Sequence, residues 1–324
     1  MPFSIGNIHI ETPAFLAPMS GVTDLPFRRM VKRYGAALVF SEMIASRSMV
    51  EEYRGSKKAS DSYAEEFPMA VQLAGCEPEI MADAARMNED RGAAIIDINF
   101  GCPVKKVVNK LGGSALMREE PLAAAIMAAT VKAVKVPVTV KMRLGWDDTS
   151  KNAPALAKMA EDCGVRMITV HGRTRQQLYN GSADWSAVRA VKEAVNIPVV
   201  VNGDITTPQQ AQEALALSGA DGVMIARGSY GRPWIVKQVM DYLKDGSETP
   251  EPGYAERRGL LHDHYEEMLQ FHGIRTGVAI ARKHIGWYCQ NLPGSGDFRA
   301  GVNALGEPEA VHAAIDRFFD TLCS

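Results

Sequence analysis

The chain has 324 residues, of which 46% are hydrophobic and 23% are charged, so we expect a folded globular protein and not a disordered one. The length is enough for one large domain and a smaller one. Lys and Arg number 36 against 38 Asp and Glu, so the overall charge lacks the basic excess of a typical nucleic-acid-binding protein, and any such role depends on local patches.

The cysteines and the N-terminus exclude two further classes of protein. Close pairing and metal-ligand spacing are both absent among Cys76, Cys102, Cys163, Cys289 and Cys323. We therefore expect a reducing cytoplasmic environment and no metal site. The first residues, MPFSIGNIHIETPAF, lack the pattern of a secretion signal, and no run approaches the roughly 18 apolar residues of a membrane span.

Short apolar runs with the length of buried parallel strands recur along the chain, each followed by a loop and a helix-like segment. The runs lie at residues 15–19, 37–43, 69–74, 94–100, 138–143, 167–172, 199–204 and 222–227. Helix-start residues lie between them at Asp24, Glu120, Asp184 and Thr207. Eight such units over about 240 residues predict an α/β fold, a closed (β/α)8 TIM barrel. An open doubly wound sheet fits less well, because the G-x-G-x-x-G turn that often follows its first strand is absent.

The barrel pattern ends at Leu243, and a different pattern follows. Residues 244–253, KDGSETPEPG, have the composition of a linker. Beyond them, apolar residues recur on one helical face in two segments. These faces comprise Leu261, Tyr265, Met268, Leu269 and His272, and then Val311, Ile315, Phe318, Phe319 and Leu322. The predicted organisation is a barrel over 1–243, a linker over 244–253 and a small all-helical C-terminal domain over 254–324.

The carboxyl ends of the predicted strands combine amide, ammonium, imidazole and thiol groups. In TIM barrels these ends meet at one opening, where active sites lie. The strand-end residues are Pro18, Met19, Glu42, Gln72, Asn99, Cys102, Lys141, Arg143, His171, Asn202, Gly203, Asp204, Ala226 and Arg227. We predict that this opening is an active site.

The last two predicted strands end in Asn202-Gly203-Asp204 and Ala226-Arg227. The loops after strands 7 and 8 of a barrel commonly form a phosphate site from backbone amides, to which an arginine adds charge-assisted hydrogen bonds. The alternative is that Gly203 and the following Gly228 only permit tight turns. This pattern does not identify the ligand that carries the phosphate.

Two polar residues interrupt apolar strands. An unpaired ammonium at Lys141 would be costly to bury. It is therefore a Schiff-base lysine, a cation beside an anionic ligand, or one half of a structural ion pair with Glu42 or Asp97. Gln72 offers an amide that suits the edge of a flat heterocycle, or it is a satisfied core residue.

Basic residues cluster in two loops near the predicted opening and predict a basic rim, the alternative being a solvated charged face. They are Lys105, Lys106, Lys110 and Arg118 in the fourth loop, and Arg173 and Arg175 in the sixth. His171 begins the sixth loop, where it binds phosphate or a ring carbonyl, or only hydrogen-bonds locally.

Cys102 lies in a sharp turn between Gly101 and Pro103, which aims the thiol instead of packing it. Most free cysteines are small buried hydrophobes, and we assign the other four to that class or to the surface. A free thiol is mostly protonated at neutral pH and suits a general acid. A nucleophile is the other option, although no histidine lies nearby in the sequence.

In this order, the motifs resemble those of the tRNA-dihydrouridine synthases, flavin-dependent barrel enzymes that reduce uridines in tRNA. The matching segments are residues 17–28, 71–75, 97–117, 140–146, 171–185, 202–205 and 219–234. The element from Asn99 to Pro103 with its downstream lysines is highly specific, and ARKHIGWY at 281–288 resembles the bacterial B subgroup. Two departures are Ser20, often alanine in the family, and Ala226, often glycine.

The resemblance implies FMN at the barrel opening and NADPH as its reductant. The positions that match the family's cofactor site are Pro18, Met19 and Ser20 near the ring, Gln72 and Lys141 at its polar edge, His171 nearby, and Asn202, Gly203, Asp204, Ala226 and Arg227 around the phosphate. Lys141 would then stabilise negative charge on the reduced flavin.

The resemblance also implies a reaction and a partner. Hydride from the flavin would reach C6 of an everted uracil, and Cys102 would protonate C5. The tRNA D-loop and elbow would contact the basic loops and the helical domain. The implied substrate-binding residues are Asn99, Lys105, Lys106, Lys110, Arg143, Arg173, Arg175, Arg282 and Lys283. Residues 244–324 hold eight Lys and Arg against twelve Asp and Glu, so that contact depends on a local face, for which Arg275 and Arg299 are further candidates.

Three other functions remain open. A flavin oxidoreductase of free pyrimidines shares the chemistry but needs neither the helical domain nor the lysines after Cys102. A non-catalytic RNA-binding or regulatory barrel has no need of Cys102 and Lys141. An aldolase-like barrel would use Lys141 as its Schiff base. The sequence indicates no obligate protein partner.

Overall fold

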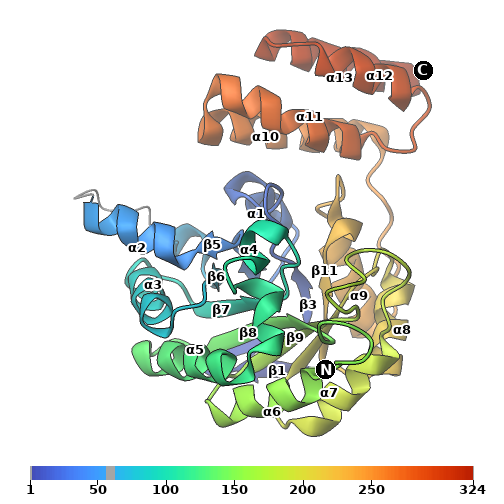
Figure 1. Cartoon of the computed structure of the whole chain (residues 1–324). Coiled ribbons are helices and arrows are strands. Elements are labelled where there is room, and N and C mark those ends of the chain that lie inside the picture. Colours follow the sequence, from blue (N-terminus) through green and yellow to red (C-terminus); the bar gives the residue numbers. More distant parts are fainter. Residues whose placement is uncertain (1, 56–62, 324) are drawn as a thin grey trace.

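The structure is a computed structural model that describes residues 2–55 and 63–323, and it contains the predicted barrel (Figure 1). Eight parallel strands follow one another in the order β3-β11-β10-β9-β8-β7-β6-β4. Their bounds are β3 Ala14–Leu16, β4 Val39–Phe40, β6 Met69–Ala74, β7 Ile95–Phe100, β8 Val138–Arg143, β9 Met167–His171, β10 Val199–Asn202 and β11 Gly222–Ile225. All eight predicted strands are confirmed, although β3, β4, β10 and β11 are clearly shorter than the runs that predicted them.

The barrel is nearly closed between β3 and β4, the two ends of this order. Phe15 of β3 meets Phe40 of β4 edge to face, with ring centroids 6.3 Å apart. Three short strands were not predicted: β5 (Ile44–Ala45), which pairs with β6, and the hairpin of β1 (Phe3–Ile5) and β2 (Ile8–Ile10). Strands of two or three residues are too short to show a clear alternation.

Alternation of side chains along each strand explains why the barrel has an apolar floor and a polar opening. On the side of the hairpin, one apolar cluster fills the interior. It contains Ile5 and Ile10 of the hairpin and Phe15, Phe40, Ala70, Ile95, Met167, Val200 and Met224 of the strands. Two residues further along the same strands, the buried residues are polar: Gln72, Asp97, Thr169 and Asn202. The functional groups therefore gather at the carboxyl ends of the strands, which we call the mouth.

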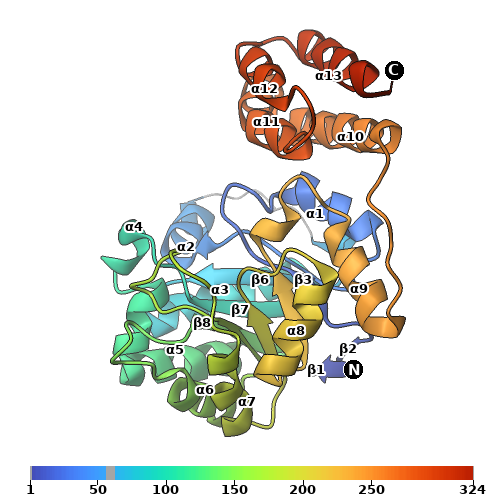
Figure 2. The same cartoon turned by 90° about the vertical axis from the view of Figure 1, so that its right-hand side faces the viewer.

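Helices surround the barrel, as the pattern predicts (Figures 1 and 2). Their bounds are α1 Leu25–Arg33, α2 Ser46–Gly55, α3 Pro78–Asp90, α4 Lys105–Val108, α5 Glu120–Ala133, α6 Ala153–Asp162, α7 Arg189–Ala194, α8 Pro208–Ser218 and α9 Ile235–Asp245. Short 3-10 turns lie at Ala64–Glu66, Gly113–Arg118, Ser186–Val188 and Arg227–Ser229.

Two of the four predicted helix starts, Asp24 and Thr207, are N-caps, and Asp184 makes a similar bond just before a 3-10 turn. Asp24 accepts from the Phe27 amide at 3.1 Å, Thr207 from the Gln210 amide at 3.1 Å, and Asp184 from the Ala187 amide at 2.9 Å. Glu120 also marks a helix start, as predicted. This residue is the first of α5 and does not cap it, because its carboxylate instead accepts a hydrogen bond of 2.6 Å from the Asn152 amide.

Four helices follow the barrel and form a separate layer beside it, which we call the helical tail (Figures 1 and 2). They are α10 Tyr254–His272, α11 Ile274–Tyr288, α12 Ser295–Asn303 and α13 Pro308–Cys323. The tail has its own apolar cluster, which contains the predicted residues Leu261, Tyr265, Met268, Val311, Ile315, Phe318 and Phe319. None of the described helices is long and apolar enough to cross a membrane.

The tail packs against the barrel through polar and aromatic contacts. His272 was predicted on the apolar face, but its Nε2 lies 2.8 Å from the carboxylate of Asp24 in the barrel. Trp287 of α11 stacks on Tyr230, in the loop after β11, with ring centroids 4.0 Å apart. The tail therefore rests on loops that border the mouth.

Candidate active site

Lys141 lies at the mouth without a carboxylate partner. Its Nζ donates to the Oδ1 atom of Asn202 at 3.0 Å. Among the described residues it forms no close ion pair with Glu42 or Asp97, although the carboxylate of Asp97 attracts it electrostatically. Burial, followed by the nearby Arg143, lowers the pKa of Lys141 to about 8. An ammonium that is desolvated and unpaired is suited to an anionic ligand, which disfavours the structural ion pair.

His171 is a neutral imidazole. Burial lowers its pKa well below the ordinary value, and the surrounding cations, Lys141 first among them, lower it further. The Nη1 atom of Arg173 lies 3.3 Å from the Nε2 atom of His171. Because a guanidinium only donates, the ring accepts at Nε2 and carries its proton on Nδ1. His171 can therefore offer one N–H to a ligand.

The predicted phosphate site has the backbone that an anion requires. The amides of Gly203 and Asp204 donate to no group in the described part of the chain. Gly203 has a φ of +122°, and a Cβ atom there would lie 2.8 Å from the ring of His171. At Gly228 a Cβ atom would lie 2.4 Å from the carbonyl oxygen of Ile205. Close packing therefore requires glycine at both positions. The amides of Gly203 and Asp204 remain available to an anion.

The carboxylate of Asp204 orients the arginines of this site. Arg173 donates to it at 3.0 Å and Arg227 at 2.8 Å. Burial raises the pKa of Asp204, but hydrogen bonds from Arg173 and from the Ala183 amide outweigh it, and the pKa lies below its ordinary value. Arg173 is 1% exposed, whereas the side chain of Arg227 is 47% exposed. Arg227 is therefore available to an anion, and Arg173 acts through Asp204.

The turn that carries Cys102 is fixed on both sides. The Oδ1 atom of Asn99 accepts from the amides of Gly101 at 3.0 Å and Cys102 at 2.8 Å, and the carbonyl of Cys102 accepts from the Ser114 hydroxyl at 2.9 Å. The thiol is free and partly buried, and it interacts electrostatically with Lys141. The structure thus places Cys102 at the mouth, in the turn after Asn99, which pairs with Lys141 across neighbouring strands.

The basic rim divides into exposed and buried members. Lys105 and Lys110 are exposed, and the side chain of Lys106 lies outside the described part of the structure. Arg143 is buried and donates to the carbonyls of Gly101 and Thr174, at 2.8 and 2.9 Å. Arg143 thus supports the Cys102 turn and has little surface for RNA.

A tryptophan joins three loops of the rim. The guanidinium of Arg118 lies 3.7 Å from the ring centroid of Trp146, and that of Arg175 lies 4.6 Å from it. Cation–π contacts with the Trp146 ring hold both arginines in place. Arg175 is therefore at the rim, as predicted, but it is partly engaged.

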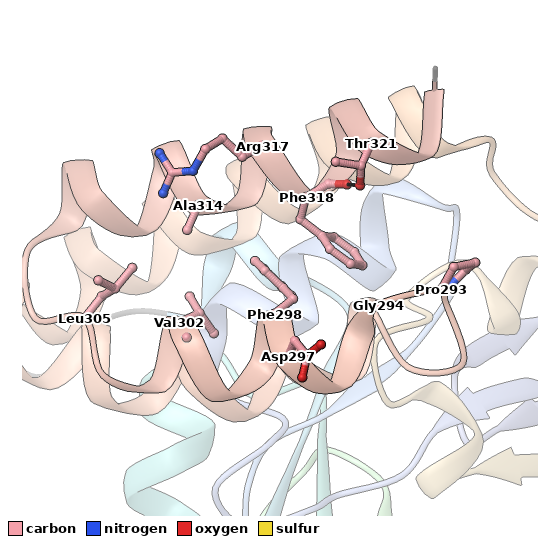
Figure 3. A pocket seen from close by; sticks show the side chains of 11 residues that line it. Pro293, Gly294, Asp297, Phe298, Val302, Leu305, Ala314, Arg317, Phe318 and Thr321 are labelled. Atoms are coloured by element: carbon pink, nitrogen blue, oxygen red, sulfur yellow. Dashed lines mark hydrogen bonds between the residues drawn. The ribbon is translucent and has the colours of Figure 1, made fainter.

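Two clefts lie in the helical tail. A polar cleft of about 810 Å³ is lined by Arg282, Lys283 and Arg299 of α11 and α12. An apolar cleft of about 480 Å³ lies between α12 and α13, where Phe298 stacks on Phe318 at a centroid distance of 4.3 Å (Figure 3). The polar cleft has the three cations expected of an RNA contact, whereas the apolar cleft is lined by one cation, Arg317, together with Asp297.

Two residues at the mouth were not predicted as site residues: Asp97, which was considered only as an ion-pair partner of Lys141, and Tyr179. Asp97 is buried beside Gln72, and its place two residues before Asn99 on the same strand puts both on the inward face, which alternation could have shown. Tyr179 is 54% exposed, and the guanidinium of Arg227 lies 5.1 Å from its ring centroid. Its position depends on the loop conformation, which no sequence pattern predicts.

These features define a class of protein. A TIM barrel whose mouth combines free backbone amides, a buried ammonium and a thiol in a fixed turn has the fold and the polar opening of a barrel enzyme, and its amides and ammonium suit an anionic ligand.

Comparisons with known proteins place the chain within this class. The model of the family "Dihydrouridine synthase (Dus)" matches residues 15–322, and the chain belongs to this family. The family is one of flavin-dependent oxidoreductases, which agrees with the phosphate site.

Similar proteins come from several bacteria. The chain is 58% identical to a "Probable tRNA-dihydrouridine synthase" of Rickettsia conorii over 98% of this chain and 96% of that protein. It is 49% identical to "tRNA-dihydrouridine synthase B" of Xanthomonas axonopodis pv. citri over 98% and 96%, and 45% identical to "tRNA-dihydrouridine synthase B" of Pseudomonas aeruginosa over 97% and 95%. These similarities confirm the resemblance to the bacterial B subgroup.

Proposed function

We propose that the protein is a tRNA-dihydrouridine synthase that reduces uridine to 5,6-dihydrouridine in the D-loop of tRNA, with FMN as cofactor and NADPH as reductant. Family membership and the names of the relatives support the reaction class. The observation that carries the proposal is the fixed turn of Cys102 beside Lys141 at the mouth.

The residues at the mouth fit FMN. The available amides of Gly203 and Asp204, together with Arg227, match a phosphate group. Lys141 and the amide of Gln72 suit the polar edge of the ring, and His171 offers its Nδ1 proton nearby. The further positions proposed for the cofactor are Pro18, Met19 and Ser20 after β3, and Asn202 and Ala226 at the ends of β10 and β11.

Each residue then has a distinct part in the reaction. When bound, FMN supplies the hydride that adds to C6 of uracil. Cys102 holds the proton that C5 requires: its S–H bond breaks as the new C–H bond forms, and the thiolate regains a proton from solvent. The ammonium of Lys141 stabilises negative charge at the cofactor edge.

The tRNA would contact the exposed basic residues beside the mouth. We propose Lys105 and Lys110 in the fourth loop, with Lys106 beside them, and Arg282, Lys283 and Arg299 in the polar cleft of the tail. Phosphate contacts of this kind position the RNA while the uridine leaves its stack. We propose residues 254–324 as the tRNA-binding domain. Arg143, Arg173 and Arg175 contribute by supporting the loops.

Dihydrouridine mapping tests the function. In tRNA from cells that lack the protein, we expect D-loop uridines to be unreduced, the wild-type gene to restore dihydrouridine, and the Cys102→Ala gene to fail. Unchanged dihydrouridine in those cells would contradict the proposal. Purified protein should be yellow and contain FMN. Equal turnover of free uridine and tRNA would instead favour an oxidoreductase of free pyrimidines.

A further inference from the structure

A relay of hydrogen bonds links the floor of the mouth to the Cys102 turn. Thr139 donates to one carboxylate oxygen of Asp97 at 2.7 Å, and the amide nitrogen of Gln72 donates to the other at 2.7 Å. The amide nitrogen of Asn99 then donates to the amide oxygen of Gln72, also at 2.7 Å. Asp97 and Thr139 are 0% exposed and Gln72 is 1% exposed, so water does not substitute for these bonds.

The direction of this relay is determined from both ends. An ionised carboxylate only accepts, so Gln72 turns its nitrogen toward Asp97 and its oxygen toward Asn99. At the other end, backbone amides only donate, so Asn99 turns its oxygen toward Gly101 and Cys102 and its nitrogen toward Gln72. The two requirements agree, and each side-chain amide has one orientation.

We infer that Asp97 is a positioning residue: as the buried acceptor at the base of the relay, it holds Gln72 and, through Asn99, the turn that presents the Cys102 thiol. The inference rests on the proposed function only for the identity of the ligands that Gln72, Asn99 and Cys102 contact. No role in the reaction follows for Asp97 itself, which lies beneath the mouth.

The relay also limits what Gln72 and Asn99 offer to a ligand. Each amide nitrogen has two hydrogens, of which one is used within the relay. The hydrogen that remains on each can only be donated. These two hydrogens are suited to acceptors of the ligand, such as carbonyl oxygens or ring nitrogens, which both a flavin and a uracil have, while the amide oxygen of Gln72 keeps one lone pair for a donor.

The environment of Asp97 is consistent with an acceptor at neutral pH. Burial raises its pKa to about 6, and the hydrogen bonds from Gln72 and Thr139 oppose that rise. The nearby ammonium of Lys141 also favours the ionised form. The carboxylate thus remains ionised under ordinary assay conditions.

Hydrogen exchange of the Gly101 and Cys102 amides tests the inference, because it needs neither cofactor nor tRNA. Asp97→Leu removes the acceptor, and we expect these amides to exchange about tenfold faster. The kcat for tRNA should fall about tenfold, with KM changed less than about twofold, because Asp97 contacts no RNA. Wild-type exchange in Asp97→Leu would overturn the inference.

Asp97→Asn is the matched conservative variant. Its Oδ1 atom can still accept from Gln72, because the Thr139 hydroxyl can accept from the new amide nitrogen in place of donating. We expect exchange within about twofold of the wild type. If the amides of Asp97→Asn exchanged as fast as those of Asp97→Leu, the negative charge at position 97 would matter and its acceptor oxygen would not. That result would overturn the inference.

A double variant decides the matter if Asp97→Leu does not fold. In Thr139→Val alone, the Asp97 carboxylate still accepts from Gln72. The Gly101 and Cys102 amides should therefore stay protected from exchange. In the double variant Asp97→Asn, Thr139→Val, the new amide nitrogen at position 97 has no acceptor. The Gly101 and Cys102 amides should then exchange faster than the two single substitutions together predict. Additive effects would overturn the inference. If the wild type reduces no tRNA uridine, the proposed function fails while these exchange rates still test the relay.

Discussion

Lys283 of helix α11 donates a hydrogen bond to the main-chain carbonyl of Gly21, 262 residues away in the sequence. Gly21 lies in the loop after β3, has a φ of +76° and donates its own amide to the carboxylate of Glu42. The loop that carries Met19 and Ser20 is therefore held by the barrel on one side and by the helical tail on the other. Lys283 was predicted to contact tRNA, and this contact gives it a second task.

Replacement of Lys283 by Ala should weaken FMN binding, because the loop that borders the cofactor loses its restraint from the tail. We expect a loss of about fivefold in affinity, measured by flavin fluorescence in the absence of tRNA. Arg317→Ala removes an exposed cation of α13 and serves as the control. If only the KM for tRNA rises, Lys283 contacts RNA alone.

Replacement of Cys102 by Ala should remove the proton donor and leave the cofactor site intact. We expect single-turnover reduction of tRNA uridine to slow by about a hundredfold or more. The visible spectrum of the bound flavin should remain, since the phosphate site and Lys141 are unchanged. Reduction at the wild-type rate would show that another group donates the proton.

The pH dependence of FMN binding should report Lys141. Its pKa is lowered to about 8, so the ammonium loses its proton, and with it the attraction for an anionic ligand, as the pH rises through that value. We expect affinity to fall above about pH 8 in titrations of the apoprotein. Lys141→Met should bind weakly without this dependence, and Lys141→Arg should shift the fall to higher pH. If Lys141→Met showed the same pH dependence of FMN binding as the wild type, that dependence would belong to another group.

Lys105→Ala and Lys110→Ala should weaken tRNA binding through lost phosphate contacts. Each should raise the KM for tRNA and reduce the slope of log affinity against log salt by about one, with kcat unchanged. Lys158→Ala provides the control, because Lys158 on α6 is paired with Glu161 and Asp162. Unchanged salt slopes would place the tRNA elsewhere.

Acid should destabilise the contact between the tail and the barrel. The rings of His264 and His284 lie 4.9 Å apart, that of His264 lies 5.5 Å from the ring of Phe27, and no ring nitrogen has a partner among the described residues. Burial lowers the pKa of His264 to about 4 and that of His284 well below its ordinary value. The unfolded chain therefore binds more protons in this window, and stability is complete above about pH 6.5 and is lost as the pH falls toward about 4.

Urea unfolding measures this effect. From about pH 7.5 to about pH 5, we expect His264 to contribute a loss of about 2 kcal/mol in the free energy of unfolding. His264→Phe keeps a ring against Phe27 and should lose that part of the dependence. An equal loss in both proteins would exclude His264 as its source.

Much of the site was predictable because strand position is a local property of the sequence. Alternation within an apolar run decides which residues point into the barrel, and parallel strands bring their carboxyl ends to one opening. Gln72, Asn99, Lys141, His171 and Asn202 were placed at the mouth on that basis. The roles of these residues toward FMN and tRNA remain predictions, since they came from the family resemblance.

The sequence by itself determined the eight strands, the helical tail and the composition of the mouth, because each follows from the period of apolar residues along one segment. Only the tertiary structure decided which polar groups are committed to one another. Arg143 and Arg173 resemble surface cations in the sequence, yet they are buried against carbonyls and a carboxylate from other loops. The roles of Asp97 and Lys283 likewise depend on hydrogen-bond partners, Gln72 and Gly21, in distant segments. Periodicity fixes the face of an element, but a hydrogen-bond partner depends on how separate elements pack together.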